Sequence, residues 1–550
     1  MTVQARFETH EIFNQSPPYE DVDLFANDRP LQDAVQTNGA AAEMEALSAF
    51  GRRWGAAEMI EQGRLANENP PKLKIFDTKG FRRDVVEFHP AYHRLMTESV
   101  KAGIHNSMWG ADGRRVSGPA EVARAARFYM ANAVEQGHLC PITMTRACVG
   151  ALAVEPSVLG RLMPKIASRA YDSRFIPWWE KDGITLGMGM TEVQGGTDVR
   201  ANTTTATPTA DGYSIIGHKW FMSAPMCDAF LVLAQAPGGL TCFLMPRFRP
   251  DGAVNALRFQ RLKDKLGNRS NASSEVEFAE AFAWRVGEEG RGVRTIIEMV
   301  QLTRLDCAIA SAGQMRMGLA QAVHHARYRT VFQRKLIDQP MMRSVLADLA
   351  LELEGAVALV MRLCRAFDSA ASDPSEAARA RVLTPAVKYA VCKTSPRFMY
   401  EAMECLGGNG YVEEGMLARL YREAPLNAIW EGCGNVMCLD VLRALARDGE
   451  AARQVLGELK RATADLPGSA EAAAFIVKTL SAADGEARAR AAVERLAMLA
   501  AAAALAESAP AAVAHAFART RLTATRGVNF GSAELEPAEV SELIERAMPA

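Results

Sequence analysis

The chain has no sequence feature that marks a metalloprotein, a secreted protein or a membrane protein. Its ten cysteines form no C-x-x-C pair and accompany no histidine cluster, which argues against a zinc site and against a disulfide framework. The first residues lack the basic and then apolar layout of a signal peptide. The longest apolar run, residues 496–506, is far shorter than the ~20 residues that cross a bilayer. We therefore expect a cytoplasmic protein with no metal site and no membrane partner.

An excess of charge of one sign is also missing. The chain carries 63 basic and 64 acidic residues, so its overall charge favours neither nucleic acid nor an anionic membrane. A dinucleotide-binding G-x-G-x-x-G fingerprint is absent, because Gly187 and Gly189 are followed by Glu192 where the third glycine would stand. No helix-turn-helix or zinc-finger pattern is visible. Any binding of nucleic acid must therefore be local and indifferent to base sequence.

What the sequence does contain is a change of pattern along its 550 residues. Apolar residues recur at helical spacing between about residues 40 and 170. Short β-rich runs separated by turn signals follow from 184 to 285, and helical spacing returns from 293 to about 447. We predict an α+β protein with an N-terminal helical domain over 1–183, a middle β domain over 184–288, a helical bundle over 289–447 and a C-terminal helical appendage over 448–550.

A loop rich in glycine and hydroxyl groups opens the predicted β domain. Residues 188–198 read Met-Gly-Met-Thr-Glu-Val-Gln-Gly-Gly-Thr-Asp and follow a short apolar run. Gly195 and Gly196 can take a positive φ and admit close approach of a ligand, while Thr191 and Thr197 can donate and accept hydrogen bonds. The loop is a candidate cofactor cradle, although two adjacent glycines are more often an ordinary turn.

Six motifs in a fixed order resemble those of one known family, the acyl-CoA dehydrogenase flavoproteins. They are the loop at 190–198, Lys-Trp-Phe-Met-Ser at 219–223, the segment 265–278, Arg-Thr-Val-Phe at 329–332, Leu-Gly-Gly-Asn-Gly at 406–410 and Trp-Glu-Gly at 430–432. The additional C-terminal segment and the stretches at 67–71 and 140–145 resemble the alkylation-response branch of that family.

The resemblance implies a fold and a cofactor. The fold is a helical domain, a β-barrel-like middle domain and a four-helix-bundle domain, with an extra C-terminal helical domain here. The cofactor is FAD, held without a covalent bond. The residues that match flavin contacts of the family are Met190, Thr191, Gly195, Gly196, Thr197, Phe221, Met222, Ser223, Arg329, Phe332, Gly408, Ile429, Trp430, Gly432 and Asn435.

Three of these positions imply an assembly. In the family, the positions of Arg329, Phe332 and Gly408 reach the FAD of a neighbouring subunit, so the resemblance implies a homotetramer built as a dimer of dimers. Taken alone, Arg329 and Phe332 would be a surface charge and a core aromatic side chain one helical turn apart. The glycines at 407–410 would, taken alone, be a helix C-cap followed by a turn.

Glu431 is the candidate base. Dehydrogenation of an acyl thioester needs a base for the α-proton as a hydride leaves the β-carbon for flavin N5, and Glu431 matches the catalytic glutamate of the family. An apolar wall at Trp430 would raise its pKa toward neutrality. Arg304 matches an arginine that lines the acyl pocket. Taken alone, Glu431 would cap a helix that begins near Asn435.

The chain departs from the family pattern at the adenosine end of the site. The usual Thr-Ser-Gln after the base reads Cys-Gly-Asn at 433–435, and the usual glutamine before Gly-Gly is Glu404. The contacts of these residues to the FAD adenosine are therefore in doubt, whereas the base is retained.

Two functions compete, and a flavin-binding scaffold without physiological dehydrogenation is a third. The first is an FAD-dependent dehydrogenase of a short or branched acyl-CoA that passes electrons to an electron-transfer flavoprotein. The second is an alkylation-response protein whose C-terminal domain binds double-stranded DNA. Residues 451–530 carry 10 basic against 7 acidic residues, which form either a solvated helix face or a phosphate-binding stripe. The stripe would include Arg488, Arg490, Arg495, Arg519, Arg521 and Arg526.

Overall fold

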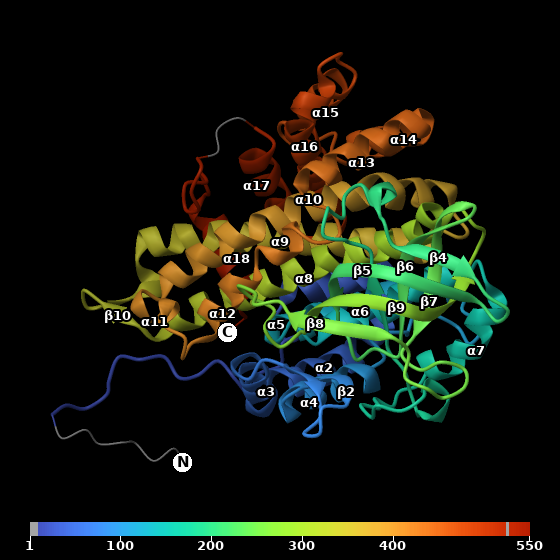
Figure 1. Ribbon diagram of the computed structural model, residues 1–550. Coiled ribbons are helices and arrows are strands. Elements are labelled where there is room, and N and C mark those ends of the chain that lie inside the picture. Colours follow the sequence, from blue (N-terminus) through green and yellow to red (C-terminus); the bar gives the residue numbers. More distant parts are fainter. Residues whose placement is uncertain (1–8, 524–526, 550) are drawn as a thin grey trace.

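The computed structural model describes residues 9–523 and 527–549 of the chain. It has a helical region, a β region and a second helical region with a C-terminal extension, which confirms the predicted α+β class. In Figure 1 the green strands lie to one side of three long helices, α8 (Gly292–Tyr328), α9 (Pro340–Ser369) and α10 (Pro374–Cys405). The N-terminal helices α2 to α4 lie below this bundle and the C-terminal helices α13 to α17 above it.

The N-terminal region is less uniformly helical than its sequence predicts. Helical spacing continues through residues 41–65, but Ala56 is extended, because Gly55 packs so closely on Val22 that the chain turns there. An unpredicted hairpin, β1 (Lys72–Phe76) with β2 (Arg82–Glu87), is short, charged and mostly exposed, so it carries little hydrophobic signal. The helices are α1 (Arg29–Val35), α2 (Met44–Gly55), α3 (Ala57–Glu68), α4 (Pro90–Lys101), α5 (Ala120–Val134), α6 (Leu139–Leu152) and α7 (Pro156–Ile166).

Five of the seven strands of the middle region close on themselves. The order β6-β4-β5-β9-β7, with a further pairing of β6 to β7, makes a ring like a small barrel, while β3 pairs with β6 and β8 with β9 outside it. β6 is buried along almost its whole length, as expected for a strand covered on both faces. The strands are β3 (Leu186–Gly189), β4 (Thr205–Pro208), β5 (Tyr213–Ser223), β6 (Ala229–Ala236), β7 (Gly239–Pro246), β8 (Leu257–Leu262) and β9 (Ser273–Val286).

A short hairpin projects from one end of the helical bundle. β10 (Thr330–Val331) and β11 (Arg334–Lys335) follow α8, and Phe332 and Gln333 between them both have a positive φ, as a two-residue turn of this hand requires. In Figure 1 the hairpin lies at the opposite end of the bundle from β5. The helices that follow α10 are α11 (Gly408–Tyr411), α12 (Met416–Glu423) and α13 (Gly434–Arg447).

The C-terminal helices pack on the bundle. α16 (Gly485–Ser508) lies against α9, α10 and α13, and most of its alanine-rich stretch is buried there because alanine side chains permit close approach. Among the described residues, no helix is long and apolar enough to cross a membrane. The boundaries of the four predicted domains stay predictions. The other helices are α14 (Gly449–Ala462), α15 (Ser469–Leu480), α17 (Ala511–Arg521) and α18 (Pro537–Ala547).

The last helix closes the structure against three earlier ones. Arg546 of α18 pairs with Glu354 of α9 at 2.6 Å and with Asp33 of α1 at 2.9 Å. Arg327, in the last turn of α8, donates to the carbonyl of Met548. The end of the chain is therefore fixed to helices that precede it by about 200 residues or more.

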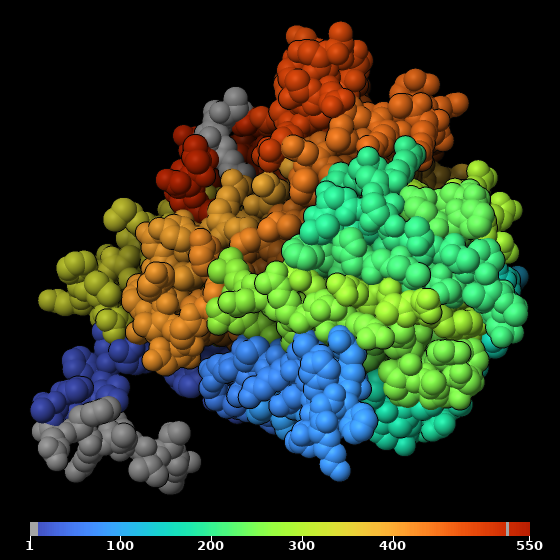
Figure 2. Space-filling model, viewed as in Figure 1, coloured from blue at the N-terminus to red at the C-terminus, as the bar shows by residue number. Residues whose placement is uncertain are grey.

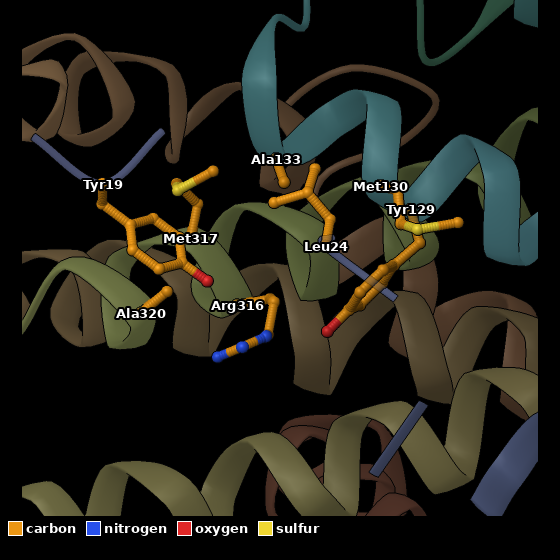
Figure 3. Close-up of a pocket in the computed structure, with 8 residues that line it drawn as sticks. All are labelled: Tyr19, Leu24, Tyr129, Met130, Ala133, Arg316, Met317 and Ala320. Atoms are coloured by element: carbon orange, nitrogen blue, oxygen red, sulfur yellow. The ribbon is translucent and has the colours of Figure 1, made fainter. Parts of the chain in front are cut away.

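The segment before α1 covers the other side of the same bundle. Asn14 exchanges two hydrogen bonds with Thr330 at the base of the hairpin. Farther along, Tyr19 covers a cavity of about 10 Å³ between α5 and α8, which is room for about one water molecule. Figure 3 shows the hydroxyls of Tyr19 and Tyr129 turned toward the guanidinium of Arg316 around this space. The cavity is too small for a cofactor and is not a candidate active site.

Candidate active site

Glu431 lies in a strained loop between the short 3-10 helix η6 (Leu426–Ala428) and α13. Its φ is 59°, and Gly432 follows at 102°. A non-glycine residue in this region costs about 1–3 kcal/mol and keeps it only where its surroundings hold it. The carboxylate does not cap α13, whose N-cap residue is Cys433, but accepts a hydrogen bond from Thr303 of α8 at 2.6 Å. The helix-cap alternative for Glu431 is therefore wrong.

Two buried cations hold this loop from behind. Lys388 of α10 is 1% exposed and donates to the carbonyls of Asn427 at 2.9 Å and Gly432 at 2.8 Å. Arg304 of α8 donates from Nε to the carbonyl of Glu431 at 3.1 Å and from Nη1 to Asp440 at 2.7 Å. Arg304 thus contacts the backbone of the candidate base. Lys388 had no sequence signal, because it stands in the middle of a long helix without a motif.

The surroundings of Glu431 suit a general base. Burial raises its pKa above the usual value, while the hydrogen bond from Thr303 and the charges of Lys388 and Arg304 act against that rise. A base that works near neutral pH needs a shift in this direction. The net result is a carboxylate with increased proton affinity, which Thr303 holds directly while Lys388 and Arg304 hold the backbone of its loop.

The other predicted residues of this loop lie on its solvent-exposed side. Ile429 is 64% exposed, and Asn435 in the first turn of α13 is also exposed. Trp430 is half-buried and donates from its indole nitrogen to Asn427 at 2.9 Å. The loop therefore presents an apolar edge to a ligand while its backbone is held from within.

The glycine-rich loop at 188–198 is anchored by a pair of buried charges. Glu192 and Lys219 of β5 form an ion pair at 2.7 Å with both side chains fully buried. Burial raises the pKa of Glu192, but hydrogen bonds from Lys219, Thr204 and Thr203 outweigh it and hold the pKa at about 2. In the sequence Glu192 only breaks a dinucleotide fingerprint, because the partner that explains it is 27 residues away.

The predicted flavin residues of this loop lie along its open edge. Gly195 and Thr197 are exposed, and Gly195 has open space beside its α-carbon. Gly196 packs on Thr191 so closely that a Cβ atom would lie 2.2 Å from the threonine hydroxyl. Met190 is half-buried and its carbonyl accepts from Asn202 at 3.1 Å. The first glycine is therefore free for a ligand, whereas the second is required by the packing of the loop.

The end of β5 supplies the neighbouring surface. Phe221 is 50% exposed, and Ser223 is half-buried with its Oγ 3.2 Å from Ser273 Oγ. Met222 requires a correction: its side chain is fully buried behind the strand against Gly189, since successive side chains of a strand alternate between its faces. Only the backbone of Met222 can contact a ligand on this side.

These parts fit the FAD that the resemblance implies. The ring of Phe221 offers an aromatic face, Ser223 offers a hydroxyl, and the open loop at Gly195 and Thr197 leaves room for a phosphate-bearing tail. The thiol of Cys140 lies near both residues: the charge of Glu431 raises the pKa of this thiol, and a hydrogen bond with Ser223 lowers it. The candidate base and the end of β5 therefore face one region of the structure.

Arg329, Phe332 and Gly408 are remote from this surface within one chain. Phe332, at the tip of the hairpin, is 90% exposed, so the core-aromatic alternative is wrong. Figure 2 shows the olive-coloured hairpin region protruding at the left edge of the molecule. Gly408 begins α11 with open space around it, after Gly407 at φ 59°, so the turn suggested by these glycines is present as well. Arg329 donates to the carbonyl of Asn14 at 2.8 Å.

The predicted stripe of arginines is not one surface. Arg521 is fully buried and pairs with Asp348 and Glu352 of α9, so its prediction as a DNA contact is wrong. The sequence could not reveal this, because a count of charges does not show which side of α17 faces the bundle. Arg526 lies outside the described residues.

The remaining predicted arginines are engaged to different degrees. Arg495 donates to two carbonyls at the end of α17, and Arg519 pairs with Glu539 at 2.6 Å. Arg488 and Arg490 are exposed on α16, where Arg490 also lies over the ring of Tyr389. Two of the predicted stripe residues therefore remain accessible to a large partner.

Three protein-family models match the chain in the order of its regions. The adaptive response protein AidB N-terminal domain matches residues 14–173. The acyl-CoA dehydrogenase middle domain matches residues 187–281, and the acyl-CoA dehydrogenase C-terminal domain matches residues 290–446. The matched residues include Glu431, Arg304 and every predicted flavin contact.

Individual relatives are similar over most of their lengths. The chain is 52% identical to AidB of Escherichia coli (strain K12) over 441 residues, which is 80% of this chain and 81% of that protein. It is 30% identical to acyl-CoA dehydrogenase family member 11 of Caenorhabditis elegans, over 84% of this chain and 77% of that one. The crystal structure of C. elegans ACDH-11 in complex with C11-CoA matches with a TM-score of 0.81 and 25% identity, over 99% and 95% of the two chains.

Proposed function

The chain belongs to the acyl-CoA dehydrogenase family of FAD-dependent oxidoreductases, in the branch of AidB, and we propose that it dehydrogenates acyl-CoA thioesters with Glu431 as the base. The observation that carries this proposal is the state of Glu431. Its strained backbone is held by Arg304, its carboxylate is fixed by Thr303, and burial raises its pKa.

Each residue has a defined task in this proposal. Glu431 takes the α-proton of the acyl group onto its carboxylate, and Thr303 holds that carboxylate in place before the transfer. Lys388 and Arg304 keep the loop from relaxing, because each donates to a backbone carbonyl of 431–432. Bound FAD supplies the acceptor for the hydride that leaves the β-carbon. An electron-transfer flavoprotein is the proposed electron acceptor.

The visible spectrum of the purified protein tests the proposal. Under anaerobic conditions, a panel of short and branched acyl-CoA thioesters should bleach the oxidised-flavin band of the wild-type protein. Glu431→Gln should keep its flavin but lose at least about 10³-fold in rate, within the range that a positioned base contributes. A wild-type flavin that no acyl-CoA bleaches would contradict the proposal, and so would an unimpaired Glu431→Gln variant.

A homotetramer is proposed as the assembly that completes the flavin site. It is supported by Phe332, whose ring is 90% exposed at the tip of a hairpin that projects from the bundle and is therefore accessible to another subunit. Arg329 and Gly408 lie in the same part of the chain, at the end of the bundle remote from β5. Sedimentation of the flavin-loaded protein tests this: Phe332→Ser should lower both the mass of the assembly and its flavin content.

DNA binding without sequence specificity, in a cytoplasmic response to alkylation damage, is the second proposed role. It is favoured by the exposed cations of α13 and α14, which make no ion pair among the described residues and outnumber the exposed acids Asp448 and Glu450. These cations are Arg443, Arg447, Arg453, Lys460 and Arg461.

Retention of duplex DNA at low salt tests the second role. The triple variant with Arg443, Arg447 and Arg453 changed to Glu should lose retention while its flavin spectrum is unchanged. A control with Arg83, Arg114 and Arg249 changed to Glu removes the same charge from the other regions and should retain DNA. If wild-type protein retains no DNA at low salt, the chain is an ordinary short- or branched-chain acyl-CoA dehydrogenase with no DNA role.

A further inference from the structure

A cation is connected to the proposed flavin surface through two hydroxyl groups. Ser223 at the end of β5 and Ser273 at the start of β9 are direct neighbours in the strand register, with their Oγ atoms 3.2 Å apart. Lys265, in the connection from β8 to β9, donates from Nζ to Ser273 Oγ at 3.2 Å and to the carbonyl of Asn271 at 2.5 Å. Neither Lys265 nor Ser273 has a part in the base or in the glycine-rich loop.

The lysine fixes one direction in this series of hydrogen bonds. An ammonium group only donates, so Ser273 Oγ accepts from Lys265, and its own proton can be donated to Ser223. In that arrangement Ser223 accepts from Ser273 and has its proton left for an acceptor outside the strand pair. The thiol of Cys140 on α6 also lies against Ser223, but sulfur is a weak acceptor. An acceptor nitrogen on a ring placed against Ser223 would compete effectively for this proton.

The charge of Lys265 is not cancelled by an ion pair in the part of the chain that the structure describes. Burial lowers its pKa to about 8, while Cys140 of α6 and Glu423 of α12 act in the other direction. Burial also raises the pKa of Glu423, to about 7, and its carboxylate accepts two hydrogen bonds from Asn268. At neutral pH the lysine is therefore mostly charged, and its acidic neighbour is only partly so.

We propose that Lys265 is a positioning residue for the flavin, which acts through Ser273 and Ser223 to polarise the hydrogen bond that Ser223 donates to the edge of the bound ring. This inference rests on the proposed function, because it needs FAD on the surface of Phe221 and Ser223. A hydrogen bond of this kind favours the electron-rich form of the ring, so its loss makes the flavin harder to reduce.

Lys263 provides a charge-matched control two residues away. It forms an ion pair with Glu275 at 2.5 Å and lies over the rings of Trp220 and Phe221, and within the described part of the chain its side chain makes no hydrogen bond to Ser273. Lys263→Met removes the same charge as Lys265→Met but leaves the hydroxyl chain intact. Ser273→Ala does the reverse, because it breaks the chain and leaves both lysines in place.

The test is the affinity of the flavin for sulfite, an anion that adds to electron-poor flavins, together with the midpoint potential. Lys265→Met and Ser273→Ala should each weaken sulfite binding by about tenfold, the effect of one charge-assisted hydrogen bond. That change corresponds to ~30 mV for a two-electron couple. Lys265→Arg should recover most of the affinity, and Lys263→Met should change it little. Above pH 8 the wild-type affinity should fall toward that of Lys265→Met.

The outcomes separate this inference from the function on which it rests. A flavin-loaded Lys265→Met variant with wild-type unfolding temperature and unchanged sulfite affinity would overturn the inference alone. Equal losses of sulfite affinity in Lys265→Met and Lys263→Met would also overturn it. The loss would then come from removing any nearby positive charge and not from the hydrogen bonds through Ser273. A wild-type protein that binds no flavin would overturn the proposed function and the inference together.

Discussion

The active-site loop and the C-terminal appendage use buried cations in different ways. At the loop, Lys388 and Arg304 donate to backbone carbonyls and hold a strained residue in place. In the appendage, Arg521 and Arg546 pair with carboxylates of α9 and fix one helix against another. In the loop, the buried cations hold the backbone in a strained conformation. In the appendage, they join helices to one another. Neither kind is available to a ligand.

The largest effect on stability is expected from removing a buried arginine that joins the C-terminal helices to α9. Arg521→Ala would remove the buried guanidinium that pairs with Asp348 and Glu352, and removal of one partner of a buried pair costs about 3–5 kcal/mol. Thermal or denaturant unfolding of the variant should show a loss of that size. Arg488→Ala removes an exposed arginine whose one ion pair within residues 9–523 and 527–549 is with Asp484, so it should change stability by less than about 0.5 kcal/mol. Equal stability of the two variants would contradict the structural role of Arg521.

Lys388→Met tests whether the buried lysine holds the active-site loop in its strained conformation. The change leaves the carbonyls of Asn427 and Gly432 without a donor, which costs about 1–3 kcal/mol and lets the loop relax. We expect flavin reduction by an acyl-CoA to slow by about 10²-fold, as a displacement of ~1 Å at a reacting group can cause. Rapid-mixing kinetics measure this. Lys393→Met, exposed on the same helix, is the control, and a matching loss there would remove the case for Lys388.

A smaller effect, on pH dependence, follows from Thr303→Val. The hydrogen bond from Thr303 favours the charged carboxylate, so its removal raises the pKa of Glu431 further. The base acts when it is deprotonated, so the acidic limb of kcat/KM against pH should move to higher pH, by up to about one unit for one hydrogen bond. The plateau at high pH should be much less affected. An acidic limb that moves to lower pH would contradict this account of the site.

The smallest effect concerns the exposed cations, which are the ones left for a ligand. If Arg447 contacts a phosphate, Arg447→Ala should reduce the slope of log affinity against log salt by about 0.9. Arg495→Ala should leave the slope unchanged, because its guanidinium is occupied by carbonyls at the end of α17. Titrations of duplex DNA at several salt concentrations compare the two. Equal slopes would remove the distinction between exposed and engaged arginines.

The sequence predicted those parts of the site that depend on local chemistry. The glycine-rich loop, Phe221 and Glu431 stand in motifs with a fixed order, and the order of helical and β regions follows from hydrophobic spacing. Met222 was misplaced because a motif names neighbours without saying which strand face each one occupies. For Arg521 a positive local composition gave no information on burial.

The parts that the sequence did not predict depend on contacts between distant residues. Thr303 lies 128 residues from the carboxylate that it holds, and Glu192 reaches its lysine across two elements. A buried charge looks like a surface charge until its partner is known. Lys265 stands inside a recognised motif, but its role depends on a register between β5 and β9 that no local pattern specifies.

The contacts of the last helix have a consequence for how the protein is made. Ribosomes add about 5–20 residues per second, so α9 emerges roughly ten to forty seconds before α18. During that interval Glu354 and Asp33 wait without Arg546, and Arg327 waits without the carbonyl of Met548. The bundle is therefore completed only after residues 546–548 have left the ribosome. A stop codon before position 546 would leave the buried carboxylate of Glu354 without Arg546 and would leave Asp33 with Arg29 alone among the described residues, so chains truncated there should be less stable.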